Sequence, residues 1–259
     1  MKVVILCGGR GVRFSEATEH KPKPLVEIGG KPILWHIMKI YSHYGYSDFV
    51  LCLGYKGEMI KKYLLDYKLM SNDFTIELGK KDRIEFHGLS DETNWKVTLA
   101  ETGLNAQTGA RIKRIEKYID SDLFMLTYGD AVANLDIERL VNFHRSHNGI
   151  GTITAVNPLS RFGQLEIGDK GKVNKFEEKG EIEGSCINGG FFVFDHRVFQ
   201  YVNDNDDCAF EQESLKKLVS DGQLAAYFHN SYWQCMDTYR DWQILEQDWS
   251  RKNPPWKVW

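Results

Sequence analysis

The chain begins with a short apolar run that ends in a glycine-rich turn, and this junction constrains the fold more than any other feature. Residues 3–6 are Val-Val-Ile-Leu, and Gly8, Gly9 and Gly11 follow. A continuous apolar run is typical of a strand buried on both faces, as in a parallel sheet. Glycines, which carry no side chain, let backbone N–H groups approach an anion closely. The junction therefore predicts an α/β fold with an anion-binding turn after the first strand.

The remainder of the chain alternates short apolar strands with longer amphipathic segments, as α/β domains do. We expect buried strands at 2–6, 49–53 and 124–128, with short edge strands within 74–101. The apolar spacing predicts helices over 33–44, 59–67, 112–119 and 135–147. From residue 151 onward strands dominate, at 152–156, 164–167, 173–177 and 190–194, before helices resume at 210–221 and 241–249. This order predicts a mostly parallel sheet flanked by helices.

Composition narrows the class of protein. The chain has 259 residues and a formal charge of −3, so it lacks the basic surface that nucleic acids or anionic membranes require. Its five cysteines form no C-x-x-C pair, which fits a reducing cytoplasm and argues against a disulfide framework. No apolar stretch is long enough for a signal peptide or a membrane span. We expect one continuous domain over 1–259 in the cytoplasm, with no nucleic-acid or membrane partner.

The glycine turn does not fit two well-known phosphate-binding motifs. A Walker-type loop needs a Lys-Ser or Lys-Thr pair after its glycines, and none follows here. The dinucleotide motif would place its third glycine at Phe14 and an acidic residue after the second strand, where Gly54, Tyr55 and Lys56 stand. An NAD-binding interpretation is therefore weak. An ordinary glycine turn remains an alternative on the residues alone.

Basic residues accompany the turn. Arg13 can add a charge-assisted contact to a phosphate. Lys21 and Lys23 follow in the segment His-Lys-Pro-Lys-Pro, where each proline fixes its own φ and biases its predecessor toward an extended backbone. The lysines are thus held on a stiff segment, which is either a phosphate-binding element or a solvated basic surface.

A carboxylate follows another predicted strand. Asp130 lies just beyond the strand 124–128, and ligands of open α/β sheets bind outside the carboxyl ends of the strands. Asp130 and the glycine turn are therefore expected on the same rim. A carboxylate there suits a magnesium ion that also contacts nucleotide phosphates. The alternative is that Asp130 caps the next helix, although Asp136 is better placed for that role.

Motifs along the whole chain resemble one family. They are, in order, LCGGRGVRFSEAT, KPKPLVEIGGKPILWHIMKIY, WKVTLAETG, TGARIKRI, LTYGDAVANLDI, RFGQLEI, INGGFFVF and YWQCMDTYRD. Together they are similar to the glucose-1-phosphate cytidylyltransferases, which belong to the sugar-1-phosphate nucleotidyltransferases. The resemblance runs from Met1 to the final Pro-Pro-Trp-Lys-Val-Trp and implies a Rossmann-like nucleotidyltransferase fold with small β-rich additions to a mixed, mostly parallel sheet. It also implies a mainly nucleotide-binding part at 1–150 and a mainly sugar-phosphate-binding part with C-terminal helices at 151–259.

The resemblance implies an activity and a nucleotide site. CMP would pass from CTP to α-D-glucose 1-phosphate, giving CDP-glucose and pyrophosphate without a covalent enzyme intermediate. The backbone of Gly8, Gly9 and Gly11 would hold the triphosphate, Arg13 would neutralise the departing pyrophosphate, and Lys23 would bridge toward the reacting phosphates, with Lys21 as its nearest rival. Around the pyrimidine ring the family matches Thr102, Gly103 and Arg111, although Arg111 is equally well interpreted as an exposed helix residue.

The resemblance also implies a metal site and an acceptor site. Asp130 and Asp237 match the two carboxylates that bind Mg²⁺ in the family. Lys179 matches the residue that pairs with the sugar 1-phosphate, and Glu178 and Asn188 match residues that contact the sugar hydroxyls. The family further implies a homo-oligomer, and the aromatic C-terminus is expected to pack on the domain or on a neighbouring subunit.

Four positions depart from the usual family pattern: Val12, Ala131, Gly180 and Cys235 stand where the family has Thr, Gly, Pro and Pro. The carboxylates and basic residues remain, so a loss of activity is not implied. Two alternatives stay open. One is a cytidylyltransferase with a different phosphorylated acceptor, and the other is a non-catalytic nucleotide-sugar-binding regulator on the same fold.

Overall fold

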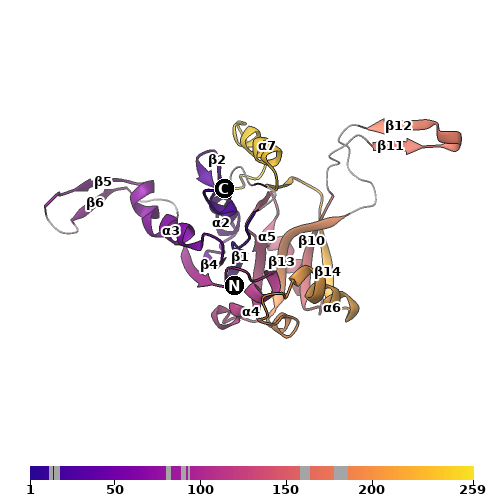
Figure 1. Ribbon diagram of the computed structural model, residues 1–259, viewed down its shortest axis with the longest axis horizontal. Helices are drawn as coiled ribbons and strands as arrows, with labels where there is room; N and C mark the ends of the chain where they lie inside the picture. The colour runs from indigo at the N-terminus through magenta and orange to yellow at the C-terminus, as the bar shows by residue number, and fades with distance from the viewer. Residues whose placement is uncertain are drawn as a thin grey trace.

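A seven-stranded sheet forms the centre of the protein, with strand order β14-β10-β13-β8-β1-β4-β7 (Figure 1). Its members are β1 (Val3–Leu6), β4 (Asp48–Leu53), β7 (Lys96–Glu101), β8 (Leu123–Tyr128), β10 (Gly151–Val156), β13 (Ile187–Asp195) and β14 (Leu224–His229). The structure, a computed structural model, describes residues 1–11, 14, 18–79, 83–88, 92, 94–157, 164–177 and 186–259. Strands from both halves of the sequence thus share one sheet.

One strand runs against the others. β1 is parallel to β4 and β8, β4 is parallel to β7, and β10 is parallel to β14. β13 is antiparallel to both of its neighbours, β8 and β10. The sheet is therefore mixed and mostly parallel, which confirms the predicted fold class. The amino end of β13 consequently lies at the same edge as the carboxyl ends of β1, β4, β7 and β8.

Both faces of the sheet are covered by helices, which explains why its strands are continuously apolar. Val3 and Ile5 face one core. Three helices cover this core, α2 (Ile33–His43), α5 (Ile137–Arg145) and α7 (Tyr239–Trp249). A fourth helix, α3 (Gly57–Ser71), contributes Ile60 to it. Val4 and Leu6 face a second core, covered by α4 (Thr108–Arg114), α6 (Leu215–Ser220) and the 3-10 helix η5 (His196–Gln200). Successive residues of β1 thus serve opposite layers.

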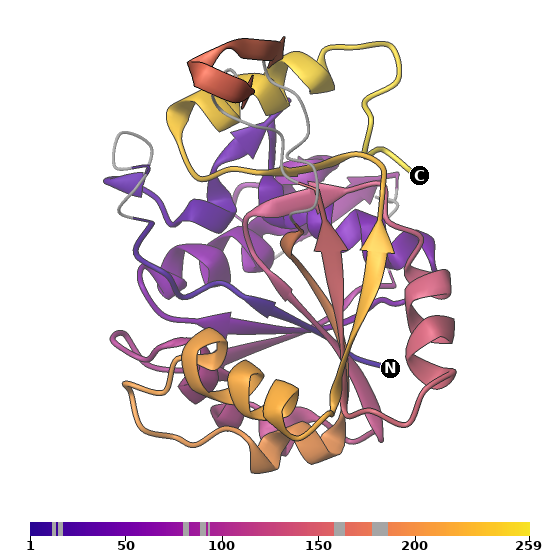
Figure 2. The same ribbon diagram turned by 90° about the vertical axis from the view of Figure 1, so that its right-hand side faces the viewer.

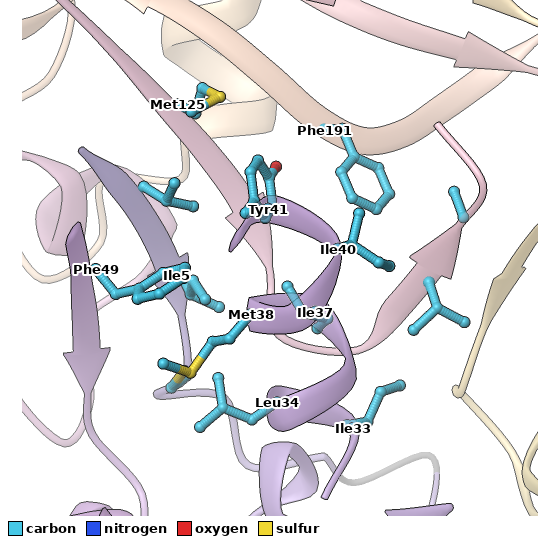
Figure 3. Close-up of a cluster of buried hydrophobic side chains, with 14 of the residues drawn as sticks. Ile5, Ile33, Leu34, Ile37, Met38, Ile40, Tyr41, Phe49, Met125 and Phe191 are labelled. Atoms are coloured by element: carbon cyan, nitrogen blue, oxygen red, sulfur yellow. The ribbon is translucent and has the colours of Figure 1, made fainter. Parts of the chain in front are cut away.

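Helix α2 shows how one layer is packed. Ile33, Leu34, Ile37, Met38 and Tyr41 recur at helical spacing, and all are at most 1% exposed. Figure 3 shows Met38 beside Ile5 and Phe49 of the sheet, and Tyr41 between Met125 and Phe191. Apolar residues at i, i+1, i+4 and i+5 form the stripe that the sheet covers. The prediction of a helix over 33–44 is confirmed to within one residue.

Some elements differ from the expectation. The helix predicted at 112–119 begins earlier, at Thr108, and continues as the 3-10 helix η3 (Glu116–Tyr118). The helix predicted at 210–221 begins with a π-helical turn, η6 (Phe210–Ser214). Strand β14 was not predicted, although it begins with the apolar run Leu-Ala-Ala-Tyr-Phe, because a short apolar run does not by itself distinguish a strand from a helix. Asp136 caps α5 by accepting from the Arg139 N–H at 2.9 Å, as expected.

Small two-stranded elements surround the central sheet. Two of them are hairpins that project from opposite ends of the molecule, β5–β6 (Asp73–Ile76 and Ile84–His87) and β11–β12 (Gln164–Ile167 and Val173–Glu177) (Figure 1). The 3-10 helix η4 (Asp169–Gly171) lies between β11 and β12. The other pairs are β2–β3 (Glu27–Ile28 and Lys31–Pro32) and β9–β15 (Ala131–Ala133 and Trp233–Cys235). These are the β-rich additions that the family resemblance implies.

The last residues of the chain pack on its own α2. Trp256 is fully buried, and the rings of Trp249, Trp256 and Trp259 all lie within 6.2 Å of the imidazole of His36, centroid to centroid.

Within the described ranges, no helix has the length and apolarity needed to cross a lipid bilayer.

The imidazole of His36 is held in its neutral form. It is fully buried, its Nε2 donates to the Ile28 carbonyl at 2.9 Å, and its Nδ1 faces the Trp256 indole N–H at 3.4 Å. Because a carbonyl only accepts, the proton sits on Nε2 and Nδ1 is the acceptor. Burial lowers the pKa of His36 to about 4.

This depressed pKa predicts a loss of stability in acid. Above pH 6.5 the ring is neutral in both the folded and unfolded states, whereas between pH 6.5 and 4 only the unfolded state takes up the proton. Stability should therefore fall as the pH falls, by about 3 kcal/mol between pH 7 and pH 4. His36→Gln keeps a donor for Ile28 but cannot titrate, so urea unfolding should show a flatter pH profile. His196→Gln, at an exposed position, should retain the wild-type slope; equal slopes for all three proteins would contradict this role for His36.

Candidate active site

A cavity of about 1020 Å³ opens where the strand ends meet. The carboxyl ends of β1 and β8 and the amino end of β13 supply residues to its wall, and so do α4, η6, β15, the segment before α7 and the start of α7. Figure 2 shows that β14 points toward the end of the molecule where α7 lies, so the carboxyl ends of the parallel strands lie at that end. The predicted residues that line this cavity are Gly8, Gly9, Gly11, Lys23, Arg111, Asp130, Asn188 and Asp237.

The glycine turn forms one side of the cavity. Gly11 has a φ of +62°, which residues with a side chain rarely adopt. At Gly8 a Cβ atom would lie 2.2 Å from the guanidinium of Arg111, so a side chain has no room there. Gly8 and Gly11 therefore each meet a local requirement of the turn, whereas a Cβ at Gly9 would meet nothing within 4 Å. Arg13, predicted to act beside them, lies outside the described residues, as does Val12.

Lys23 lies between two carboxylates at the floor of the cavity. It begins the 3-10 helix η2 (Lys23–Leu25), and its Nζ is 2.6 Å from both Asp130 Oδ2 and Asp237 Oδ1. Lys21 instead pairs with Glu27 at 3.2 Å, near the surface. Of the two candidate lysines, Lys23 is therefore the one that faces the carboxylates.

The charges of this group stabilise one another. Burial opposes the ammonium charge, but the attraction of Asp130 and the hydrogen bonds to both carboxylates raise the pKa of Lys23 above its ordinary value. Asp130 and Asp237 come from distant segments, and the Met236 N–H, which donates to the Asp130 carbonyl at 2.8 Å, ties these segments together. The carboxylates thus converge on one point.

This donor set fits a magnesium ion. Mg²⁺ is usually bound by one or two carboxylates together with substrate phosphates and water. Among the described residues, no group of three or more His, Cys, Asp or Glu side chains forms a protein-only metal cage. Asp130 and Asp237, which share the Lys23 ammonium, match the pattern of two carboxylates that bind Mg²⁺ together with a phosphate.

Arg111 occupies a structural position behind the turn. It is 4% exposed, and its guanidinium lies within 3.1 Å of the carbonyls of Leu53, Gly103 and Gly8 and of the Thr102 hydroxyl. These acceptors follow or end β4, β7 and β1, so one side chain ties three strand ends together. Burial lowers the pKa of Arg111. The alternative interpretation of Arg111 as an exposed helix residue is therefore wrong.

Two of the three residues expected around the base lie behind Arg111. Thr102 is fully buried, and its hydroxyl donates to the Leu53 carbonyl at 2.6 Å. Gly103, with a φ of +97°, packs against Arg114. In the part of the chain that the structure describes, the residues on this side of the cavity wall are Ala106, Gln107, Thr108 and Arg111. Thr102 and Gly103 thus act on the cavity through Arg111, because its guanidinium stands between them and the turn.

Asn188, which was predicted to contact the sugar, lines the cavity. It is the second residue of β13, and its Oδ1 accepts from the Gly190 N–H at 2.8 Å while its Nδ2 donates to the Tyr128 hydroxyl at 3.1 Å. Glu178 and Lys179, predicted beside it, lie outside the described residues, as does Gly180.

Several polar residues of the wall were not predicted. Three of them, Thr108, Tyr128 and Glu211, form one group in which Glu211 contacts the other two. Tyr128 ends a buried strand two residues before Asp130, which is a position where a polar residue reaches the rim. Glu211 lies in a segment that the apolar spacing assigned to an ordinary helix, so nothing in the sequence marked it.

The chain belongs to the nucleotidyl transferase family, whose model matches residues 2–244. It is 48% identical to the glucose-1-phosphate cytidylyltransferase of Salmonella typhi, and 44% identical to the probable glucose-1-phosphate cytidylyltransferase of Bacillus subtilis. Both alignments cover the whole of each chain. Among solved structures, HddC from Yersinia pseudotuberculosis superimposes with a TM-score of 0.68 and 26% identity, over 96% of this chain and 99% of that one.

Loss of the Arg111 fork should destabilise the protein. Arg111→Lys keeps the charge but replaces a planar fork by a single ammonium, so several buried acceptors lose their donor. We expect the free energy of unfolding, measured in urea, to fall by about 2 to 4 kcal/mol. The same change at Arg139, whose side chain is 79% exposed, should have almost no effect. An unaltered stability of Arg111→Lys would contradict the structural role.

Proposed function

We propose that this protein is a glucose-1-phosphate cytidylyltransferase, which transfers CMP from CTP to α-D-glucose 1-phosphate. The products are CDP-glucose and pyrophosphate. The observation that carries the proposal is full-length similarity, at 48% and 44% identity, to two proteins of that name. It is joined by a cavity in which an ammonium group and two carboxylates converge beside a glycine turn.

The reaction is a direct displacement. An oxygen of the sugar phosphate attacks the α-phosphorus of CTP, the bond from that phosphorus to the bridging oxygen breaks, and pyrophosphate leaves with the electron pair. The protein has to align the two phosphates and neutralise their charge, because no covalent enzyme intermediate forms. We assign residues 1–150 mainly to the nucleotide and 151–259 mainly to the sugar phosphate.

On the nucleotide side, the backbone N–H groups of Gly8, Gly9 and Gly11 hold the triphosphate, and Arg13 neutralises the departing pyrophosphate. The support for this assignment is the absence of side chains in the turn and its place on the cavity wall. Arg111 keeps the turn beside the base-binding segment through the Gly8 and Gly103 carbonyls.

Lys23 contacts the reacting phosphates, and Asp130 and Asp237 hold Mg²⁺. The bound ion supplies positive charge to the phosphate oxygens. Because the ammonium of Lys23 contacts both carboxylates in the structure, it balances their charge and keeps them together in the absence of nucleotide. Thr102, Gly103 and Arg111 form the base-binding side, where Arg111 lines the cavity together with Ala106 and Gln107.

On the acceptor side, Lys179 pairs with the sugar phosphate, and Glu178 and Asn188 bind sugar hydroxyls. The orientation of the Asn188 amide, fixed by Gly190 and Tyr128, supports its part. We place the reaction in the cytoplasm, which suits a protein whose five cysteines are all free thiols.

Carboxylate variants test the proposal. Wild-type protein with Mg²⁺, CTP and glucose 1-phosphate should release pyrophosphate, and dTTP should replace CTP poorly. Asp130→Asn and Asp237→Asn should each lower kcat by about 100-fold or more, because charge neutralisation at the phosphates is lost.

Asp136→Asn is the matched control, since asparagine also caps a helix and α5 lies away from the cavity. It should retain wild-type turnover. Pyrophosphate release that is absent with every nucleotide and phosphorylated acceptor would contradict the enzyme and favour a regulator. Release with dTTP but not CTP would overturn the base assignment.

We also propose that copies of this chain form a homo-oligomer. The β11–β12 hairpin exposes Leu165, Ile167, Val173 and Phe176, each at least 49% accessible, on an arm that projects from the body. Apolar side chains gathered on a projecting arm are characteristic of a surface that a partner covers. A second copy of the chain would cover it most simply, since a self-complementary contact needs one surface only.

Mass measurement tests this assembly. Light scattering coupled to gel filtration should give a multiple of the chain mass of 29.9 kDa. The double variant Leu165→Ser, Phe176→Ser should shift the mass toward one chain, because it removes apolar area from the arm. Val219→Ser, at a 63% exposed apolar position on α6, should leave the mass unchanged. A wild-type mass of one chain would contradict the proposal.

A further inference from the structure

A chain of four polar side chains crosses the cavity wall. Glu211 is at its centre: its Oε2 accepts from the Thr108 hydroxyl at 2.6 Å, and its Oε1 accepts from the Tyr128 hydroxyl at 2.7 Å. Tyr128 in turn accepts from Asn188 Nδ2 at 3.1 Å. All four residues line the cavity, and they come from α4, β8, β13 and η6.

Chemistry fixes the direction of each hydrogen bond. A carboxylate only accepts, so both hydroxyls must donate to Glu211. The Tyr128 oxygen is then left to accept, and it receives the amide N–H of Asn188. The Asn188 carbonyl oxygen points the other way, to the Gly190 N–H at 2.8 Å. The amide of Asn188 thus has one orientation, which the Gly190 N–H fixes on one side and Glu211 supports, through Tyr128, on the other.

The neighbouring backbone supports the same arrangement. The Phe210 N–H donates to the Thr108 hydroxyl oxygen at 2.9 Å, so that hydroxyl also has a fixed direction. A Cβ at Gly190 would lie 2.6 Å from the Tyr128 ring, so the ring packs where only glycine fits. Burial, together with the charge of Glu211, raises the pKa of Tyr128 and keeps its hydroxyl protonated as a donor.

The local backbone around Glu211 is also unusual. Glu211 lies in the π-helical turn η6, and such turns occur frequently at functional sites. The adjacent Glu213 belongs to the same turn but is exposed and is not part of the cavity wall. The turn therefore presents one of its two first-turn glutamates to the cavity.

We propose that Glu211 is a positioning residue that couples the acceptor side of the cavity to its nucleotide side. Its Tyr128 arm orients the Asn188 amide for the sugar, and its Thr108 arm fixes the start of α4, the helix that carries Arg111. This role rests on the proposed function, because it takes Asn188 as a sugar ligand and the α4 side as the nucleotide site. One carboxylate then sets the geometry of both substrates.

Single variants separate the two arms. Tyr128→Phe removes the hydroxyl between Glu211 and Asn188, so KM for glucose 1-phosphate should rise about tenfold while KM for CTP stays the same. Thr108→Val breaks the other arm, together with the Phe210 N–H contact to the same hydroxyl, so KM for CTP should rise about tenfold while KM for glucose 1-phosphate stays the same. Glu211→Ala should raise both.

Two further variants distinguish positioning from simple destabilisation. Glu211→Gln offers an oxygen to Tyr128 and an N–H to the Thr108 oxygen, so it should restore both KM values to near the wild-type level. Glu213→Ala is the matched control in the same turn and should change neither. Thermal unfolding of every variant is measured in parallel, and Tyr128→Phe, which is nearly isosteric, serves if Glu211→Ala does not fold.

Dissociation constants for CTP and for glucose 1-phosphate, measured by calorimetry, apply the same test without turnover. If the wild-type protein shows no turnover, but Tyr128→Phe and Thr108→Val still weaken the binding of glucose 1-phosphate and of CTP separately, the result contradicts the proposed function and not the coupling. If turnover is normal but the two single-arm variants do not change the two KM values separately, the coupling is overturned and the proposed function stands. The same holds if Glu211→Ala lowers the unfolding temperature and leaves both KM values unchanged.

Discussion

The contact of the Lys23 ammonium with Asp130 and Asp237 is the interaction on which the candidate site depends. Each of the three residues belongs to a different part of the chain, and 214 residues separate the first from the last. Without Lys23, two partly buried carboxylates would face each other across the cavity floor, and their repulsion would oppose the folded arrangement. With it, the carboxylates are held together before any nucleotide or metal arrives. The segments that carry η2, the end of β8 and the start of α7 are thereby joined.

The fold could be predicted to a large extent, because a strand that is buried on both faces is a continuous run of apolar residues in the sequence. Val3 to Leu6 and Phe49 to Leu53 are apolar throughout, since neighbouring residues enter different cores. Strand β14 was not predicted even though its first five residues are apolar, because a short apolar run does not by itself distinguish a strand from a helix. The residues of the site were predicted where a polar group follows a strand, as Asp130 does, or where a motif matched a family.

Other parts of the site could not be predicted because they depend on tertiary contacts. Arg111 lies on a short helix and resembles any surface arginine in sequence, and only the approach of three strand ends makes it buried. Glu211 lies in a π-helical turn, whose altered spacing no apolar pattern reveals. Thr102 carries the residue type expected of a base ligand, but its hydroxyl is bound to the backbone of the neighbouring strand.

The reversed direction of β13 constrains how the site can move. The strand is hydrogen-bonded on both sides, to β8 and to β10, and Phe191 to Phe194 anchor it in the two cores. Asn188 pairs with Ala155 of β10 and donates to the hydroxyl of Tyr128, the last residue of β8, so both neighbouring strands hold it in place. The separation between the proposed acceptor residue and the end of the strand that precedes Asp130 is thus set when the sheet forms. Adjustment to a substrate has to come from segments outside the central sheet, which gives the catalytic alignment the rigidity of a core.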